Sequence, residues 1–180
     1  MKRIKSKQKN MVFVFISYSW DNKQHKKWVK VLADKLIKNG INIILDHYDL
    51  HTGMDKNSFM ENSIKKSKKV LLILTPNYAK KADKRKGGVG HEYSIIDSEI
   101  SDNITQMKKY IPILRRGSDK TSCPMFLKQL IFRDMRKESN FKTEFEGLLC
   151  DIYDKHPIKP PVGDIPVRFI NKKIILKTNG

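Results

Sequence analysis

The sequence predicts an α/β fold, a three-layer sandwich in which helices cover both faces of a central parallel five-stranded sheet. Short apolar runs rich in Val, Ile and Phe alternate along the chain with longer amphipathic segments. The runs are apolar at consecutive positions, as is typical of strands buried on both faces. The 180 residues, 39% of them hydrophobic, suit one domain with its own core.

Five strands are expected, each a short apolar run bounded by polar or turn-forming residues. Because helical segments separate them, the connections are crossovers and the strands should be parallel. The expected order is flavodoxin-like, with ligands bound beyond the carboxyl ends of the strands. The strands are expected at residues 11–16, 41–45, 70–75, 110–114 and 130–132.

Helices are expected where apolar residues recur at steps of three or four. The first carries Trp28, Leu32 and Leu36; Asp21 or Asn22 can cap its start, and Asn39-Gly40 is a typical end. The others should run through residues 59–64, from about 91 with Ile96, Ile100 and Ile104, and through residues 141–153. Polar loops are expected at residues 46–55 and 77–90.

The ends of the chain differ in composition from its middle. Residues 1–10 form a basic leader, residues 11–156 the domain, and residues 157–180 a Pro-rich linker or C-terminal tail in which 167–176 could add a strand. No apolar stretch approaches the roughly 20 residues that span a bilayer, and no secretory signal is visible. With Cys123 and Cys150 alone, there is no disulfide framework or four-ligand zinc pattern, so a cytoplasmic location is expected.

The net charge of +18 is open to three interpretations: a lysine-rich solvated surface, attraction of an anionic ligand, or binding of nucleic acid. Lysine supplies 30 of the 37 basic residues, whereas proteins that read base edges rely on arginine. We therefore favour the solvated surface and expect neither a specific nucleic-acid partner nor a membrane partner.

Polar residues follow the first two expected strands. Ser17, Ser19 and Trp20 suit a polar or stacking lining, since the GxSxG elbow of a serine nucleophile is absent. Asp46 and His47 begin a loop that also holds further acids and a second histidine, but the spacing of these residues matches no zinc or calcium pattern. No metal site is expected.

Glu92 is the most informative carboxylate. It lies four residues before Ile96, on the apolar stripe of its helix and in the first turn, at the carboxyl edge of the sheet. A catalytic role and a favourable interaction with the helix dipole are equally compatible with this position. The preceding Gly87-Gly88-Val89-Gly90 allows close backbone approach or a flexible helix entry, but it is not a Walker loop.

Three short segments, in order along the chain, resemble sequence motifs of TIR domains. Residues 12–18, VFVFISY, resemble the first signature box. Residues 43–46, followed by Asp49-Leu50 and Gly53, resemble the second strand and its loop, and residues 88–92, GVGHE, fall where NAD-cleaving members carry their catalytic Glu. The resemblance covers about residues 11–154 and is closest to bacterial TIR and SEFIR-like domains. Ser19 and Trp20 replace the basic residues that many members place after the first box.

The resemblance implies an NAD+ glycohydrolase that releases nicotinamide and ADP-ribose or its cyclic variant, with a role in bacterial immune signalling such as antiviral defence. It implies self-association through TIR–TIR contacts, further TIR or effector domains as partners, and no cofactor beyond NAD+ as substrate. The alternative is a non-enzymatic signalling scaffold. Glu92 would be catalytic, and the substrate would be bound by Ser17, Ser19, Trp20, Asp46, His47, Leu50, Gly53 and His91.

Overall fold

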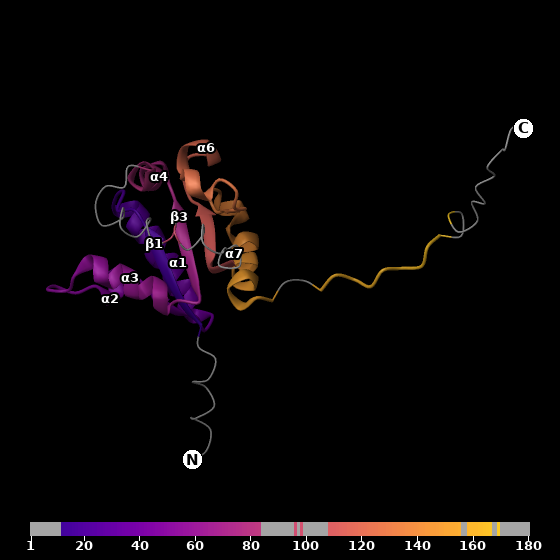
Figure 1. The fold of residues 1–180 in the computed structure, drawn as a ribbon, viewed down its shortest axis with the longest axis horizontal. Coiled ribbons are helices and arrows are strands. Elements are labelled where there is room, and N and C mark those ends of the chain that lie inside the picture. Colours follow the sequence, from indigo (N-terminus) through magenta and orange to yellow (C-terminus); the bar gives the residue numbers. More distant parts are fainter. Residues whose placement is uncertain are drawn as a thin grey trace, which may run out of the picture.

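The sheet has five parallel strands in the order β2-β1-β3-β4-β5, as predicted (Figure 1). The computed structural model describes residues 12–83, 96, 98, 108–155, 158–166 and 169. The edge strands are short, three residues in β2 and two in β5. The strands are β1 (Phe13–Tyr18), β2 (Asn42–Ile44), β3 (Lys69–Leu74), β4 (Tyr110–Leu114) and β5 (Arg133–Asp134).

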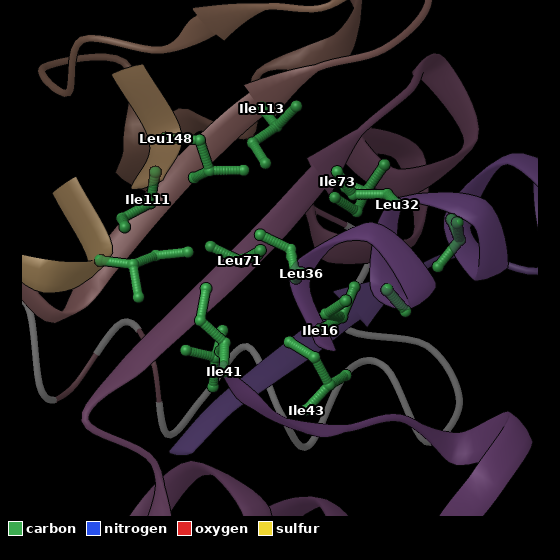
Figure 2. Close-up of a cluster of buried hydrophobic side chains, with 14 of the residues drawn as sticks. Ile16, Leu32, Leu36, Ile41, Ile43, Leu71, Ile73, Ile111, Ile113 and Leu148 are labelled. Carbon is green, nitrogen blue, oxygen red and sulfur yellow. The ribbon is translucent and has the colours of Figure 1, made fainter. Parts of the chain in front are cut away.

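The central strand β3 is buried along its whole length, because β1 and β4 flank it and helices cover both of its faces. This burial explains why the run KVLLIL does not alternate between polar and apolar residues. Side chains on one face of the sheet, among them Ile16, Leu71 and Ile113, pack with Leu32, Leu36 and Leu148 from the helices (Figure 2).

Helices α1 (Lys23–Lys38) and α7 (Glu138–Tyr153) cover that face of the sheet. Helices α3 (Lys56–Lys66) and α4 (Pro76–Asp83) cover the other face, where Met60, Ile64 and Tyr78 pack against Leu72 (Figure 1). The start and end predicted for α1 are confirmed: Asn22 Oδ1 accepts a hydrogen bond from the amide of His25, and Gly40 has φ +84°.

The fifth strand was predicted in the wrong place. Residues 130–132 form no strand, and Ile131 is 95% exposed; pairing begins at Arg133, opposite Ile113. The reason is that a 3₁₀ helix, η2 (Met125–Leu127), continues into a turn in which the amide of Leu130 donates to the carbonyl of Leu127. An edge strand of two residues also needs no apolar run of its own.

Parts of both predicted polar loops are helical. The loop predicted at 46–55 begins with the short helix α2 (Asp46–Asp49), and the loop predicted at 77–90 begins with α4. In α4, Pro76 occupies the first turn, where no amide donor is required, and Thr75 Oγ1 accepts from the amide of Tyr78. The short helix α6 (Asp119–Ser122) was not predicted from the sequence.

Several predictions fall wholly or partly outside the described residues. Of the helix expected from residue 91, Ile96 and Ser98 are described; both are helical and Ile96 is fully buried. Residues 158–166 contain no helix or strand, and the division into leader, domain and tail stays a prediction. Across the described part of the chain, no helix is both long enough and apolar enough to span a bilayer.

Candidate functional site

A pocket lies at the carboxyl ends of β1 and β2, where a parallel sheet is expected to bind ligands. It has a volume of about 110 Å³ and mixes aromatic, apolar, acidic and cationic side chains. Strand β1, the segments that follow β1 and β2, and helices α3 and α4 all contribute to it. The lining residues are Phe15, Ile16, Ser17, Tyr18, Trp20, Asp46, Leu50, Lys56, Phe59, Met60 and Lys81.

Asp46 joins two aromatic side chains at this pocket. It is the first residue of α2, directly after β2, and both of its carboxylate oxygens accept hydrogen bonds. Tyr18 Oη donates to Oδ1 at 3.0 Å, and Trp20 Nε1 donates to Oδ2 at 2.6 Å. Burial, and then the negative charge of Asp46, raise the pKa of Tyr18, so its hydroxyl stays protonated and remains a donor.

Trp20 lines the pocket, and lysine side chains lie over its ring. Its side chain is 49% exposed, yet Lys26 Nζ lies 3.9 Å and Lys56 Nζ 4.9 Å from the centre of its ring. Lys56 and Lys81 also line the pocket. The site therefore offers an aromatic face together with ammonium groups, a combination that suits a ligand with both a ring and an anionic group.

The two serines predicted at this site have different surroundings. Ser17 lines the pocket, and its hydroxyl lies 3.1 Å from Tyr78 Oη. Ser19 is fully buried outside the pocket lining, where its hydroxyl donates to Asp21 and lies 3.1 Å from Thr75 Oγ1. Ser19 thus connects the loop after β1 to the end of β3.

Of the remaining residues predicted for the site, some line the pocket and others do not. Leu50 lines the pocket together with Ser17, Trp20 and Asp46. His47 and Gly53 are exposed and do not line it; the His47 ring packs on Tyr48, and Gly53 has φ +89° with no atom within 4 Å of where a Cβ would stand. His91 and Glu92 lie outside the described residues.

Several residues that line the pocket were not predicted from the sequence. Tyr18 stands in the FISY signature, and the strand alternation with Ile16 could have placed its side chain. Phe59 and Met60 fall within a predicted helix, and they line the pocket from that helix. No signal distinguishes Lys56 and Lys81 among 30 lysines, because their role depends on how helices pack.

Within the described ranges, no group of three His, Cys, Asp or Glu side chains lies close enough together to hold a metal ion. The acidic and histidine residues that follow β2 are separated by the geometry of α2. Asp46 faces the two aromatic residues, whereas Asp49 Oδ2 accepts from the amide of Leu45.

Comparisons with known proteins agree with this architecture. The family model described as TIR domain matches residues 14–149. The crystal structure of a prokaryotic SEFIR domain is 40% identical, covers 79% of this chain and 99% of that chain, and has a TM-score of 0.65. A search of curated proteins gives no match.

Two more distant structures share the fold. The TIR domain of the Toll-related Receptor TRR-2 from Hydra magnipapillata is 20% identical, with 78% of this chain and 97% of that chain covered and a TM-score of 0.59. The TIR domains of the activated Roq1 resistosome are 16% identical, with 78% and 99% covered and a TM-score of 0.57. The family match, the strand order and the SEFIR relative agree, and the chain belongs to the TIR domain family.

Proposed function

We propose that this TIR domain is an NAD+ nucleosidase that cleaves the bond between nicotinamide and ribose and releases ADP-ribose or its cyclic form. The observation that carries the proposal is the pocket at the carboxyl edge, where an exposed indole, a carboxylate and two lysines line one cavity. The TIR family includes both NAD-cleaving enzymes and non-enzymatic scaffolds. The place of action would be bacterial immune signalling in the cytoplasm.

The chemistry requires one carboxylate. Nicotinamide leaves NAD+ as a neutral ring, so no acid has to protonate the leaving group. The transition state is a ribose with oxocarbenium character, which a nearby negative charge stabilises. We assign this role to Glu92, which precedes the buried Ile96 by four positions in the sequence.

Ile96, four residues after Glu92 in the sequence, packs with residues that line the pocket. Ile96 is fully buried in the cluster that contains Phe15 and Met60, and both of these residues line the pocket. Ile96 therefore lies on the same face of the sheet as these two lining residues. Positions four before and three after Ile96 share one face of a helix, so the choice of Glu92 over Glu99 rests on the sequence, in which Glu92 is the nearer of the two to the end of β3.

The pocket residues would then divide the binding of NAD+. The Trp20 ring offers a surface for stacking, and Lys56 and Lys81 offer charge for the diphosphate. Asp46 acts through Trp20, because its hydrogen bond to Nε1 sets the direction of the indole. Ser17 and Leu50 complete the wall from the two strand ends.

The volume of the pocket argues for a site completed by further groups. About 110 Å³ is well below the roughly 300–1,000 Å³ of ordinary ligand pockets, so it would hold one end of a dinucleotide. We infer that residues from a second copy enclose the remainder, through the loop that follows β2. All residues from His51 to Ser58 in that loop and the start of α3 are exposed.

The same two observations support the alternative function, a signalling scaffold without catalysis. A small pocket and a fully exposed loop would also suit a domain that acts by TIR–TIR association alone. The prokaryotic SEFIR relative and the TIR domains of the Roq1 resistosome are compatible with either function.

The test is nicotinamide release by wild type, Glu92→Gln and Glu99→Gln at matched high concentration. Gln keeps the shape but removes the charge, so Glu92→Gln should lose roughly a hundredfold to a thousandfold in rate. Its melting temperature should change little, because a neutral amide at a helix start forfeits at most about 1 kcal/mol of interaction with the helix dipole.

Glu99→Gln is the matched control and should retain activity. Equal rates for wild type and Glu92→Gln would remove the assignment, and loss of folding in Glu92→Gln would make Glu92 a structural residue. Wild type that self-associates but releases no nicotinamide would establish the scaffold.

A further inference from the structure

The amino-terminal edge of the sheet, opposite the pocket, is rich in lysine. The helices run back from the carboxyl edge, so α1 and α3 end at the amino edge, where β3 and β4 begin. Asp151 and Asp154 are the acidic residues at the end of α7. The amino-edge lysines are Lys35 and Lys38 of α1, Lys65 and Lys66 of α3, and Lys68, Lys69, Lys108 and Lys109 at the starts of β3 and β4.

The acids at this edge are already engaged. Asp154 forms ion pairs of 2.7 Å with both Lys68 and Lys69, and Asp151 pairs with Arg133. Within the described residues, the exposed Lys35, Lys38, Lys66 and Lys108 form no salt bridge. Lysines at helix C-termini are favourable for the helix dipole, which accounts for Lys35, Lys38, Lys65 and Lys66 but not for Lys68, which follows the end of α3 and precedes β3.

The same edge exposes apolar side chains beside the cations. An open groove of about 1270 Å³ is lined by Lys65, Lys68, Lys108 and Lys109, together with Phe132 and the 95% exposed Ile131. A single exposed aliphatic side chain is ordinary on a protein surface, but here Ile131 lines the same groove as Phe132 and several lysines. The groove therefore has the mixed character of a binding surface.

The tail adds to this surface. In the sequence it follows α7, whose end is fixed to the amino edge by the pair between Asp154 and Lys69. The yellow segment of the tail lies beyond the lower end of α7 (Figure 1). Its apolar side chains are strongly exposed: Ile158 94%, Val162 89%, Ile165 67% and Phe169 61%. In the sequence, residues 1–10, with five Lys and Arg, directly precede the chain that enters β1 at the same edge.

We infer that the amino edge of the sheet, with the tail that leaves it, docks on an anionic lipid bilayer. Lysines are attracted to anionic headgroups, and exposed aliphatic and aromatic side chains insert at the boundary of the acyl chains. Nucleic acid is favoured less, because Lys outnumbers Arg by 30 to 7 and aliphatic side chains do not recognise bases. The pocket, at the opposite edge, would face away from the membrane and stay open to solvent.

The inference does not depend on the proposed enzymatic function. It also differs from the expectation of no membrane partner. The lysines are scattered along the sequence, and they form a cationic surface only where the fold brings the ends of helices and the starts of strands together.

The test is co-sedimentation of the full chain with phosphatidylcholine vesicles, with and without phosphatidylglycerol. Binding should require the anionic lipid and should weaken as salt rises toward ~0.15 M. The variant Lys38→Gln/Lys66→Gln/Lys108→Gln should lower the partition constant roughly a hundredfold, since each lysine near the surface contributes about fivefold. Ile158→Ser/Val162→Ser/Ile165→Ser should make the remaining binding more sensitive to salt.

The matched control removes the same charge from the other side of the molecule, as Lys23→Gln/Lys120→Gln/Lys137→Gln, three exposed lysines at helix starts. Its partition constant should fall much less than that of the amino-edge variant. Equal losses in the two variants, or equal binding to neutral vesicles, would overturn the inference. Capture of the chain by RNA or DNA but not by anionic vesicles would assign the surface to nucleic acid instead. Melting temperatures verify that each variant is folded.

Discussion

At the scale of the residue, Asp154 combines an unusual backbone conformation with a charge interaction. It ends α7 in the left-handed region, with φ 54° and ψ 39°, which Asp and Asn tolerate better than most residues. Its carboxylate accepts from Lys68 and from Lys69, whose side chain is only 7% exposed. These hydrogen bonds from Lys68 and Lys69 lower the pKa of Asp154 to about 2 from the usual 3.8.

Replacement of Asp154 by Asn should lower stability in a way that depends on pH. Because the folded pKa lies below the unfolded value, the charged carboxylate stabilises the fold above pH 4, and this contribution is lost as pH falls toward 2. Asp154 is about half exposed, so solvent screening limits the loss to about 1–2 kcal/mol at neutral pH. Denaturant unfolding of both proteins at pH values from about 7 down to about 2 measures the difference in stability.

Asn accepts the left-handed conformation, so this change isolates the charge from the backbone. Asp164→Asn, in the exposed tail, is the control and should leave stability unchanged at every pH. A stability difference between wild type and Asp154→Asn that stayed constant down to pH 2 would show that the charge is not the cause.

At the scale of the element, the contact between α7 and β5 depends on a missing side chain. Gly147 lies in the middle of α7, where Gly normally costs about 1 kcal/mol relative to Ala. A Cβ at this position would stand 2.7 Å from Arg133 Cζ. Arg133, from β5, pairs with Asp151 and Glu144 of the same helix, so the glycine lets the guanidinium lie flat against α7.

We expect Gly147→Ala to have opposite effects in two backgrounds. In the wild type, the new methyl group displaces the guanidinium from its acidic partners, and the gain in helix propensity is cancelled or reversed. In an Arg133→Ala background the space is free, and Gly147→Ala should stabilise the fold by about 0.5–1 kcal/mol. A double-mutant cycle by denaturant unfolding gives the coupling, expected at about 1 kcal/mol or more. Additive effects would show that the guanidinium moves without cost.

The elements also show what the sequence could predict and what it could not. The strands buried on both faces were found because their apolar runs leave no alternative, as in the KVLLIL of β3. Helix α4 was missed because Lys80, Lys81 and the nearby glycines suggested a loop, although Tyr78, Ala79 and Ala82 form its buried stripe. Edge strand β5 pairs through two polar residues, which no hydrophobic pattern can reveal.

The same limit applies to the candidate site. Ser17, Trp20, Asp46 and Leu50 could be placed near one another because they follow strand ends at the same edge of the sheet. The hydrogen bonds of Asp46 to Tyr18 and Trp20, and the positions of Lys56 and Lys81, depend on helix packing that sequence spacing does not encode. The predictions for His91 and Glu92 concern residues outside the described part of the chain.

At the scale of the whole molecule, the proposed activity should depend on association. The pocket of about 110 Å³ is too small to enclose a dinucleotide, and the proposed function assigns the missing wall to a second copy. The rate of nicotinamide release should therefore rise faster than linearly with protein concentration, and the dilute domain should be mainly monomeric. Specific activity that stays flat over a wide dilution series would contradict this.

A substitution at Met54 tests the same dependence of activity on association. It is 47% exposed in the loop after β2, so Met54→Lys should reduce association and the activity at high concentration. The control is Met125→Lys, a 72% exposed methionine in η2, which should change neither. Sedimentation velocity and nicotinamide release, measured on the same samples, compare the two variants.

The short edge strands limit how copies of this protein can join. An exposed strand offers a row of unpaired amides and carbonyls on which another chain can add a strand, and long exposed edges lead to aggregation. Here the sheet ends in three residues of β2 on one side and two residues of β5 on the other, too few to template a neighbouring strand. Copies must therefore meet through side chains and loops, so that their sheets stay separate. The strength of such an assembly is then set by its side-chain contacts, and not by backbone hydrogen bonds along a continuous intermolecular sheet.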